Sequence, residues 1–327
     1  MKARLIINPI SGTENKSGLD AYVSDTLSPH GWEVETCFTA AKGDATRLAG
    51  EAVEMGYDAV FAAGGDGTVN ETAAALCGSK TALGIIPCGS GNGLARHLGI
   101  PIDIREGVKN IIAHPSHAID YATVNSRKFF CTFGVGFDAA VSEAFAKKKT
   151  RGKFTYLQST FQTYAHFKPE LYKITANGRT ITEKAFLVAV CNASQYGNNA
   201  YIAPNASIDD GLLDVTIIHA GNTLSTALVG FDMLTGMIER NMLIHTLRTD
   251  RLLIERTEGP GCAHIDGEPL SLEASLDICC HPRSLRVFSP LKLPTFKPFL
   301  TPAQAFLSDF RIAARKLFEV SVSGSGH

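Results

Sequence analysis

The stretch AAGGDGTVNE, residues 62–71, places three glycines and an aspartate at the end of an apolar run. A buried strand that runs directly into glycines is typical of an open α/β sheet, where the loops at the carboxyl ends of the strands hold a ligand. Glycines lack a Cβ atom, so backbone N–H groups can approach phosphate oxygens, and a helix beginning near Val69 adds a favourable dipole. A carboxylate repels a phosphate, so Asp66 makes sense in a phosphate site if a divalent cation lies between the two, or if Asp66 faces the proton of an incoming hydroxyl group.

Two more strand ends carry loops of the same kind. NPISG (8–12) follows the first apolar run, and GSGNG (89–93) follows ALGIIP. The lysine-containing P-loop and the GxGxxG dinucleotide turn are both absent, which excludes these two nucleotide-binding types. A single glycine cluster is equally compatible with a tight turn. Three clusters at strand ends of one sheet favour a shared crevice.

The pattern of apolar residues differs between the two halves of the chain. Up to about residue 125, apolar runs alternate with helix-like stretches such as GDATRLAGEAVEM (43–55), which predicts an open, mostly parallel α/β sheet. Many short apolar runs then follow, with an Asn177-Gly178 hairpin signal, and predict a mainly antiparallel β-sandwich that is interrupted by helical stretches at 153–166 and near 223–240. The expected strands are Phe129–Phe133, Tyr172–Ile181, Phe186–Asn192, Leu213–Ile218, Leu252–Ile254, Ala263–Asp266, Leu276–Cys279 and Leu285–Phe288. We therefore expect a nucleotide-binding domain (1–125), a β-rich domain (126–290) and a C-terminal extension with a helix and a disordered tail (291–327). The nucleotide cleft would lie between the first two.

Composition limits the protein class. Of 327 residues, 45% are hydrophobic and 19% charged, and the net charge of −1 argues against an obligate nucleic-acid binder. No apolar run reaches the roughly 18 residues of a membrane-spanning helix. The eight cysteines contain no CxxC pair and indicate free thiols in a reducing, cytoplasmic setting. His97, His114 and His117 are interpreted as surface or capping residues.

Six stretches, in this order, resemble the diacylglycerol kinase catalytic-domain superfamily of lipid kinases, which includes soluble bacterial diacylglycerol kinases and the sphingosine and ceramide kinases. They are NPISG (8–12), GGDGTVNE (64–71), GIIPCGSGNGLAR (84–96), FGVGFDAAV (133–141), APNASIDDGLLDV (203–215) and IDGEP (265–269). NAD kinases are similar more distantly. The ordered set spans the chain to about residue 290 and is far more specific than any one motif.

The resemblance implies a set of nucleotide and metal contacts. ATP would be bound by Asn8, Pro9, Ile10, Ser11, Gly12, Thr39, Gly65, Asp66, Gly67, Thr68, Val69, Asn70, Glu71 and Ser90. A Mg²⁺ ion would be held by the Asp210 side chain and the carbonyl groups of Ser207 and Leu212. Oxygen ligands from a turn suit this ion, which usually keeps several waters.

The resemblance also implies a pair of catalytic acids, Asp266 and Glu268. Two positions apart in an extended segment, both side chains can face one cleft, and one carboxylate can take the proton of the acceptor hydroxyl during phosphoryl transfer. Which acid is the base stays open. From the residues alone, ordinary turns are the preferred explanation of both Asp266-Gly267 and Asp209-Asp210-Gly211.

The expected activity is ATP- and Mg²⁺-dependent transfer of a phosphoryl group to a lipid hydroxyl, most simply that of diacylglycerol. Gly93 stands where many bacterial relatives have an acid, which leaves a sphingoid base or ceramide as an alternative acceptor. A nucleotide-binding regulatory protein without turnover is the alternative from another class, although it would have no use for the acid pair.

A basic and aromatic segment runs from Lys147 to Pro169. Its lysines, followed by an aromatic helical stripe over 153–166, suit either a solvated loop with a core-packed helix or an anionic membrane surface. The lipid substrate favours peripheral, reversible membrane contact by a cytoplasmic protein.

Overall fold

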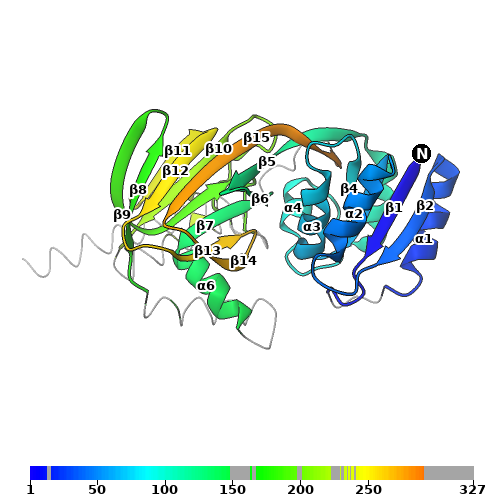
Figure 1. Ribbon diagram of the computed structural model, residues 1–327, viewed down its shortest axis with the longest axis horizontal. Coiled ribbons are helices and arrows are strands. Elements are labelled where there is room, and N and C mark those ends of the chain that lie inside the picture. The colour runs from blue at the N-terminus through cyan, green and yellow to red at the C-terminus, as the bar shows by residue number, and fades with distance from the viewer. Residues whose placement is uncertain are drawn as a thin grey trace, which may run out of the picture.

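The computed structural model describes residues 1–12, 16–147, 167–196, 201–221 and 241–290, together with isolated positions at 163, 229, 232, 233, 235, 237 and 238. Two lobes lie side by side (Figure 1), and their described strands belong to one fifteen-stranded sheet. The helices expected at 153–166 and 223–240 fall outside the described residues, apart from those isolated positions. The expected C-terminal extension, 291–327, falls outside them entirely.

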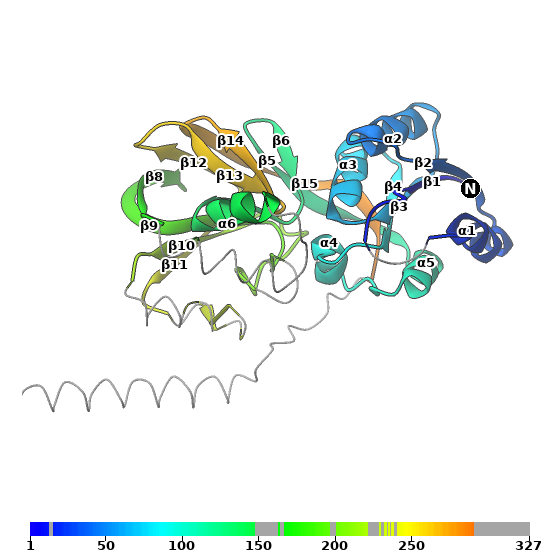
Figure 2. The same ribbon diagram turned by 90° about the horizontal axis from the view of Figure 1, so that it is seen from below.

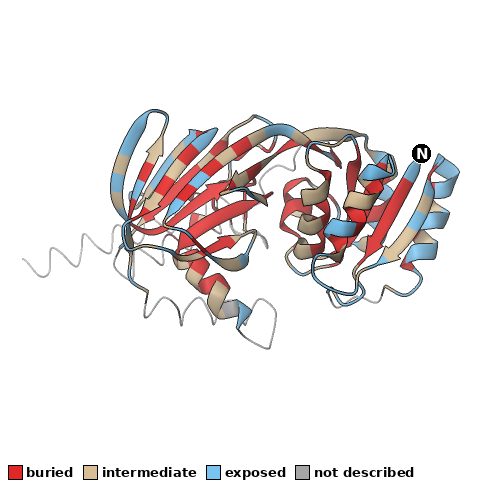
Figure 3. Cartoon of the chain, in the orientation of Figure 1, coloured by how far each residue is buried: buried red, intermediate tan, exposed pale blue. Residues whose placement is uncertain are grey.

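The N-terminal lobe is an α/β sheet, as the alternating sequence pattern predicts. Its parallel strands lie in the order β4-β3-β1-β2. Both β3 and β4 are buried along their whole length because helices cover both faces of a parallel sheet (Figure 3). The strands are β1 (Lys2–Ile7), β2 (Glu33–Phe38), β3 (Ala59–Gly64) and β4 (Ala82–Pro87). The helices are α1 (Leu19–Leu27), the short 3₁₀ helix η1 (Ser28–His30), α2 (Asp44–Glu54), α3 (Asp66–Leu76), α4 (Gly93–His97) and α5 (Ile104–Ala113).

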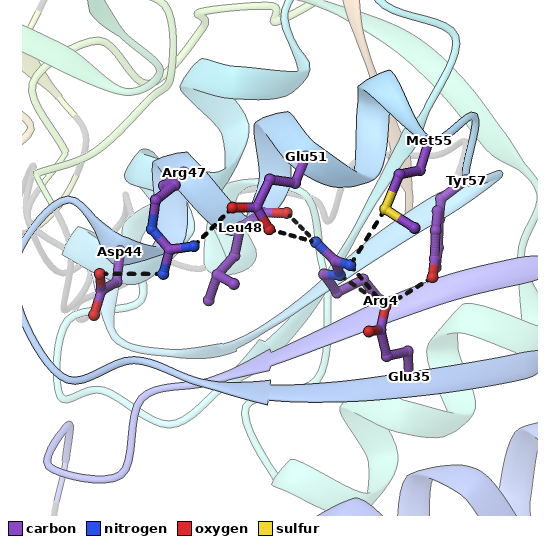
Figure 4. Close-up of polar contacts among 8 residues, drawn as sticks. All are labelled: Arg4, Glu35, Asp44, Arg47, Leu48, Glu51, Met55 and Tyr57. Carbon is purple, nitrogen blue, oxygen red and sulfur yellow. Dashed lines mark hydrogen bonds and ion pairs between the residues drawn. The ribbon is translucent and has the colours of Figure 1, made fainter.

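A chain of ion pairs holds α2 on the sheet (Figure 4). The buried Arg4 of β1 contacts Glu35 of β2 at 2.8 Å and Glu51 of α2 at 3.2 Å. Arg47 extends the chain along α2, at 2.7 Å from Glu51 and 3.5 Å from Asp44. Removing these carboxylates would leave the buried Arg4 guanidinium group without a counter-ion, which would strongly destabilise the folded state. The network therefore holds the C-terminal half of α2 against β1 and β2.

The C-terminal lobe is an antiparallel β-sandwich. Asn177 and Gly178 have φ values of 51° and 71° and join two strands in a tight hairpin, which confirms the Asn-Gly signal. The strands are β5 (Ser116–Val124), β6 (Arg127–Phe129), β7 (Thr132–Gly136), β8 (Glu170–Ala176), β9 (Arg179–Cys191), β10 (Leu213–His219), β11 (Ile244–Thr249), β12 (Arg251–Arg256), β13 (Gly261–Ile265), β14 (Glu268–Leu272) and β15 (Ser275–Phe288). Apolar residues from β5 to β15 form one buried cluster between the two layers. One helix, α6 (Phe137–Ala146), packs beside β13 and β14 (Figure 2).

Strand β15 joins the two lobes. The runs Leu276–Cys279 and Leu285–Phe288, expected as separate strands, are parts of this single strand. Its first half pairs with β12, while Val287 near its end pairs in parallel with Leu83 of β4. The sequence pattern thus changes near residue 125, but the N-terminal sheet also includes the end of β15, which lies far beyond that residue.

All eight cysteines are free thiols, and each is buried or half-buried. Burial raises the pKa of Cys77 and Cys280 to about 12, so these thiols are poorly reactive at neutral pH. Within the part of the chain that the structure describes, no helix combines the length and the apolar character needed to cross a bilayer.

Candidate active site

The three glycine loops meet at the carboxyl edge of the N-terminal sheet, as their positions at strand ends predict. Asn8, after β1, donates from Nδ2 to Thr68 Oγ1 at 3.0 Å. Gly12 has a φ of 68° and packs so closely on the Cys88 carbonyl group that a Cβ atom would overlap it. Only glycine fits such a backbone approach without strain. The loops after β1, β3 and β4 thus form one packed unit.

Asp66 joins two of these loops. Its carboxylate accepts backbone N–H bonds from Asn92 at 2.9 Å and from Gly93 at 2.7 Å. A Cβ atom on Gly91 would lie 2.6 Å from Asp66 Oδ2, so the second loop needs a glycine there. A side chain at position 93 would also lie beside this carboxylate, because a Cβ atom on Gly93 would be 3.8 Å from Asp66 Oδ1. The aspartate in the glycine loop is therefore tolerated because backbone N–H groups already stabilise its charge.

Five more of the residues expected to bind ATP differ in how far they are exposed. Pro9, Ile10 and Ser90 are exposed at the loop tips, with Ile10 88% exposed. Thr68 and Val69 are buried in the first turn of α3, so only their backbone can face a ligand.

Three further nucleotide candidates tie the loops to their surroundings. The Thr39 N–H group donates to the Ile7 carbonyl oxygen at 3.0 Å, which continues the β1–β2 pairing to the loop before α2. Glu71 accepts from the Gly43 N–H group at 2.9 Å. Asn70 reaches the other lobe and donates to Asp266. These contacts tie the loop before α2 to β1 and α3, and tie α3 to the acid turn.

Asp266 and Gly267 form the hairpin turn between β13 and β14, with φ values of 49° and 82°. The interpretation of this Asp-Gly pair as a turn is thus confirmed, but its carboxylate also has partners. Asn70 Nδ2 donates to Asp266 Oδ2 at 3.0 Å. Three backbone N–H groups donate as well, those of Phe130 (2.9 Å), Cys131 (2.8 Å) and Thr132 (2.9 Å). Burial raises the pKa of Asp266, and these N–H groups oppose the rise.

Glu268, two residues further, is exposed and faces the N-terminal lobe. Its Oε2 atom pairs with Lys42 Nζ at 2.7 Å, and a Cβ atom on Gly67 would lie 3.3 Å from its Oε1 atom. The hydrogen bond from Lys42 to Glu268 raises the pKa of the lysine. Sequence reasoning missed Lys42, although it is the one charged residue between Thr39 and Gly43. The structure therefore brings an accessible carboxylate and an ammonium group to the glycine loop.

The expected metal loop is held from behind by Asp120 of β5. The buried Asp120 carboxylate accepts the N–H groups of Gly211 and Arg283, both at 2.6 Å. Burial raises the pKa of Asp120, which these two hydrogen bonds oppose. Asp210 accepts the Leu212 N–H group at 3.0 Å and forms an ion pair with Arg248 of β11. Both Asp120 and Arg248 went unnoticed in the sequence, because neither belongs to the loop that it contacts.

His97 is not a surface or capping residue, contrary to the interpretation from sequence. It is 5% exposed at the end of α4, and its Nδ1 atom accepts the Ser194 N–H group of the other lobe at 3.1 Å. Burial lowers the pKa of His97 to about 4, so the ring is neutral at physiological pH. The local sequence shows no sign of this contact, since Ser194 lies 97 residues away.

Comparisons with known proteins agree with this architecture. Residues 2–124 match the model of the diacylglycerol kinase catalytic domain, and residues 131–289 match that of the YegS C-terminal NAD kinase beta sandwich-like domain. A "probable lipid kinase YegS-like" of Citrobacter koseri is 31% identical over 303 residues, covering 90% of this chain and 98% of the relative. A "diacylglycerol kinase" of Bacillus subtilis is 32% identical over 226 residues, covering 68% of this chain and 75% of the relative. A crystal structure from Bacillus anthracis, described as a "putative diacylglycerol kinase", is similar with a TM-score of 0.75 and 26% identity, covering 89% of this chain and 97% of that one.

The α/β lobe with three glycine loops, facing an acid turn of a β-sandwich, defines a lipid kinase of the diacylglycerol kinase class. Within that class, the chain belongs to the family of diacylglycerol kinases and YegS-like lipid kinases. The resemblance seen in the six sequence motifs is thereby confirmed.

Proposed function

We propose that the protein transfers the γ-phosphoryl group of ATP, in the presence of Mg²⁺, to the hydroxyl group of diacylglycerol or a related lipid. One observation carries the proposal: Glu268 of the sandwich lies beside Gly67 and Lys42 of the N-terminal lobe. A carboxylate opposite a glycine loop is the arrangement that a kinase needs to bring an acceptor hydroxyl to a bound phosphate.

In this proposal the nucleotide phosphates lie on the glycine loops. Backbone N–H groups at the N-terminus of α3, before the Val69 N–H group that donates to Gly65, and those of the loop around Ser90 face them, with Asn8 to Gly12 and Thr39 closing the site. The N-terminus of α3, eleven residues long, adds its dipole. Lys42 lies beside Glu268 in the free enzyme and provides a positive charge for the transferred group.

The two acids divide the work between them. Glu268 is the general base, because its carboxylate is exposed and its hydrogen-bond partner among the described residues is the exposed side chain of Lys42. Asp266 holds the turn, because four hydrogen bonds from Asn70 and from residues 130–132 occupy its oxygens. The base must reach the hydroxyl proton within hydrogen-bond distance, which an exposed side chain on a fixed turn can do.

The donor set of residues 207–212 fits a structural Mg²⁺ ion. The Asp210 carboxylate and the carbonyl groups of Ser207 and Leu212 are hard oxygen ligands on a turn that Asp120 anchors. The Arg248 guanidinium contacts the same carboxylate and would have to give way to the ion. When bound, the ion supplies positive charge that keeps the loop folded at the rim of the cleft.

A lipid acceptor also implies reversible contact of this cytoplasmic enzyme with a membrane surface. Lys147, at the end of α6, pairs with Glu143 at 2.8 Å, and the rest of the basic segment, 148–153, lies outside the described residues. The division into domains at 1–125, 126–290 and 291–327 remains part of the proposal, and the two matched family models support its first boundary.

The proposal is tested with labelled ATP, Mg²⁺ and detergent-dispersed diacylglycerol, sphingosine, ceramide and a soluble alcohol. We expect transfer to diacylglycerol, and its loss in Glu268→Gln with ATP binding retained. Preferred transfer to sphingosine or ceramide would support the alternative acceptor. ATP binding without transfer to any of these acceptors would contradict the kinase proposal and favour a regulatory protein.

A further inference from the structure

A buried chain of polar side chains lies directly behind the acid turn. His264 of β13 and Asp138 of α6 are 1% and 7% exposed, and His264 Nε2 lies 3.0 Å from Asp138 Oδ2. The hydroxyl group of Tyr196 donates to the same Asp138 oxygen at 2.8 Å. A buried ion or imidazole is costly unless it is fully paired, so this cluster is under strong geometric constraint.

Gly134 of β7 makes the pairing between His264 and Asp138 possible. It lies opposite His264 in the β7–β13 register, and a Cβ atom there would overlap both Asp138 Oδ2 and His264 Nε2. Strand β7 thus has a residue without a side chain at the position where His264 and Asp138 are in contact. This accounts for the first glycine and the aspartate of the motif FGVGFDAAV, to which the phosphoryl-transfer site gives no role.

The other ring nitrogen of His264 points to the turn. The Gly267 N–H group donates to His264 Nδ1 at 3.4 Å, and Nε2 therefore carries the proton that is donated to Asp138. The chain runs from Tyr196 through Asp138 and His264 to Gly267, the residue between the two acids. Asp266 is held by residues 130–132 on its own side of the turn, so the turn is fixed from two directions.

We propose that His264 and Asp138 are positioning residues for catalysis, which hold the Asp266-Gly267 turn so that Glu268 faces the glycine loop. The proposal rests on the role of Glu268 as general base. Glu268 follows Gly267 directly, so a rotation of that glycine moves its carboxylate away from Gly67. Glycine rotates freely unless a contact restrains it, and a misplacement of about 1 Å can cost roughly 100-fold in rate.

Substitutions at His264 test the proposal. His264→Leu removes both hydrogen bonds, and we expect kcat to fall roughly 100-fold with the KM for ATP unchanged. His264→Gln can donate to Asp138 and accept from Gly267, so its kcat should stay within about tenfold of the wild type. Leu272→Ala, in the same hairpin but in the sandwich core, is the control for lost stability: its melting temperature falls while the kcat of folded protein is unchanged.

A double substitution shows whether His264 acts through Glu268. In a Glu268→Gln background, His264→Leu should lower kcat by less than about threefold, because the group that it positions is already disabled. A further 100-fold loss in that background, or a normal kcat in folded His264→Leu, would overturn the inference. If His264→Leu does not fold, His264→Gln and Asp138→Asn are measured in the same two backgrounds. Normal turnover of Glu268→Gln by itself would instead contradict the proposed function.

Discussion

Asp266→Asn and Glu268→Gln should distinguish the roles of the two acids. Asp266→Asn should lower folding stability, whereas Glu268→Gln should lower activity alone. Asp266 Oδ1 accepts two N–H bonds, and Oδ2 accepts one N–H bond and the Asn70 amide. An asparagine in either orientation places its NH₂ group against two donors. Two buried hydrogen bonds are then lost, at about 1 to 3 kcal/mol each. The charge removed with the carboxylate, whose burial raises the pKa of Asp266, offsets part of this, so we expect a loss of about 2 to 4 kcal/mol.

Glu268→Gln should behave differently because the side chains of Glu268 and Lys42 are 55% and 79% exposed. An exposed ion pair contributes less than about 1 kcal/mol, whereas loss of a general base lowers turnover by about 100-fold or more. Thermal denaturation and kcat at saturating ATP measure the two effects, with calorimetry to show that ATP still binds. Wild-type stability of Asp266→Asn would refute the holding role of Asp266, and wild-type kcat of Glu268→Gln would refute the role of Glu268 as base.

Four further outcomes are expected. Gly12→Ala should lower ATP affinity at least tenfold by overlap within the loops, whereas Gly18→Ala, which has a similar φ but open space around it, should not. Melting temperature should rise with Mg²⁺ in the wild type and less in Asp210→Ala, and equal responses would exclude that metal site. Folding stability should fall by up to about 3 kcal/mol from pH 6.5 to pH 4, because the folded pKa of His97 is about 4 and the unfolded chain takes up the proton first. If denaturation of the His97→Gln variant shows the same loss of stability between pH 6.5 and pH 4, this pH dependence belongs to other groups. The protein should sediment with anionic vesicles at low salt but not at high salt, and less of it should sediment when Lys147, Lys148 and Lys149 are changed to Gln. Binding that does not depend on salt would exclude electrostatic attachment.

Much of the fold could be read from the sequence because its signals are local. Buried parallel strands are continuous apolar runs that end in glycines, as at Gly64-Gly65, and the Asn177-Gly178 turn needs only residues that tolerate positive φ. The strands β5, β11 and β14 were not recognised. Strand β15 was read as two, because the polar stretch His281–Ser284, with Pro282 and Arg283 exposed, interrupts the apolar pattern. Pairing with distant strands decides the length of β15.

The candidate site divides in the same way. The sequence by itself determined the family and the positions of the three glycine loops, because these depend on residue type and spacing along short motifs. The catalytic role of the two acids, which the resemblance implies, stays a prediction. Tertiary structure alone decided that Asp66 ties two glycine loops together, that His97 is buried against Ser194, and that backbone N–H groups enclose Asp266 while Glu268 is exposed and paired with Lys42. The reason is physical: whether a carboxylate is a base or an anchor depends on the N–H groups around it, and those groups come from segments far away in the chain.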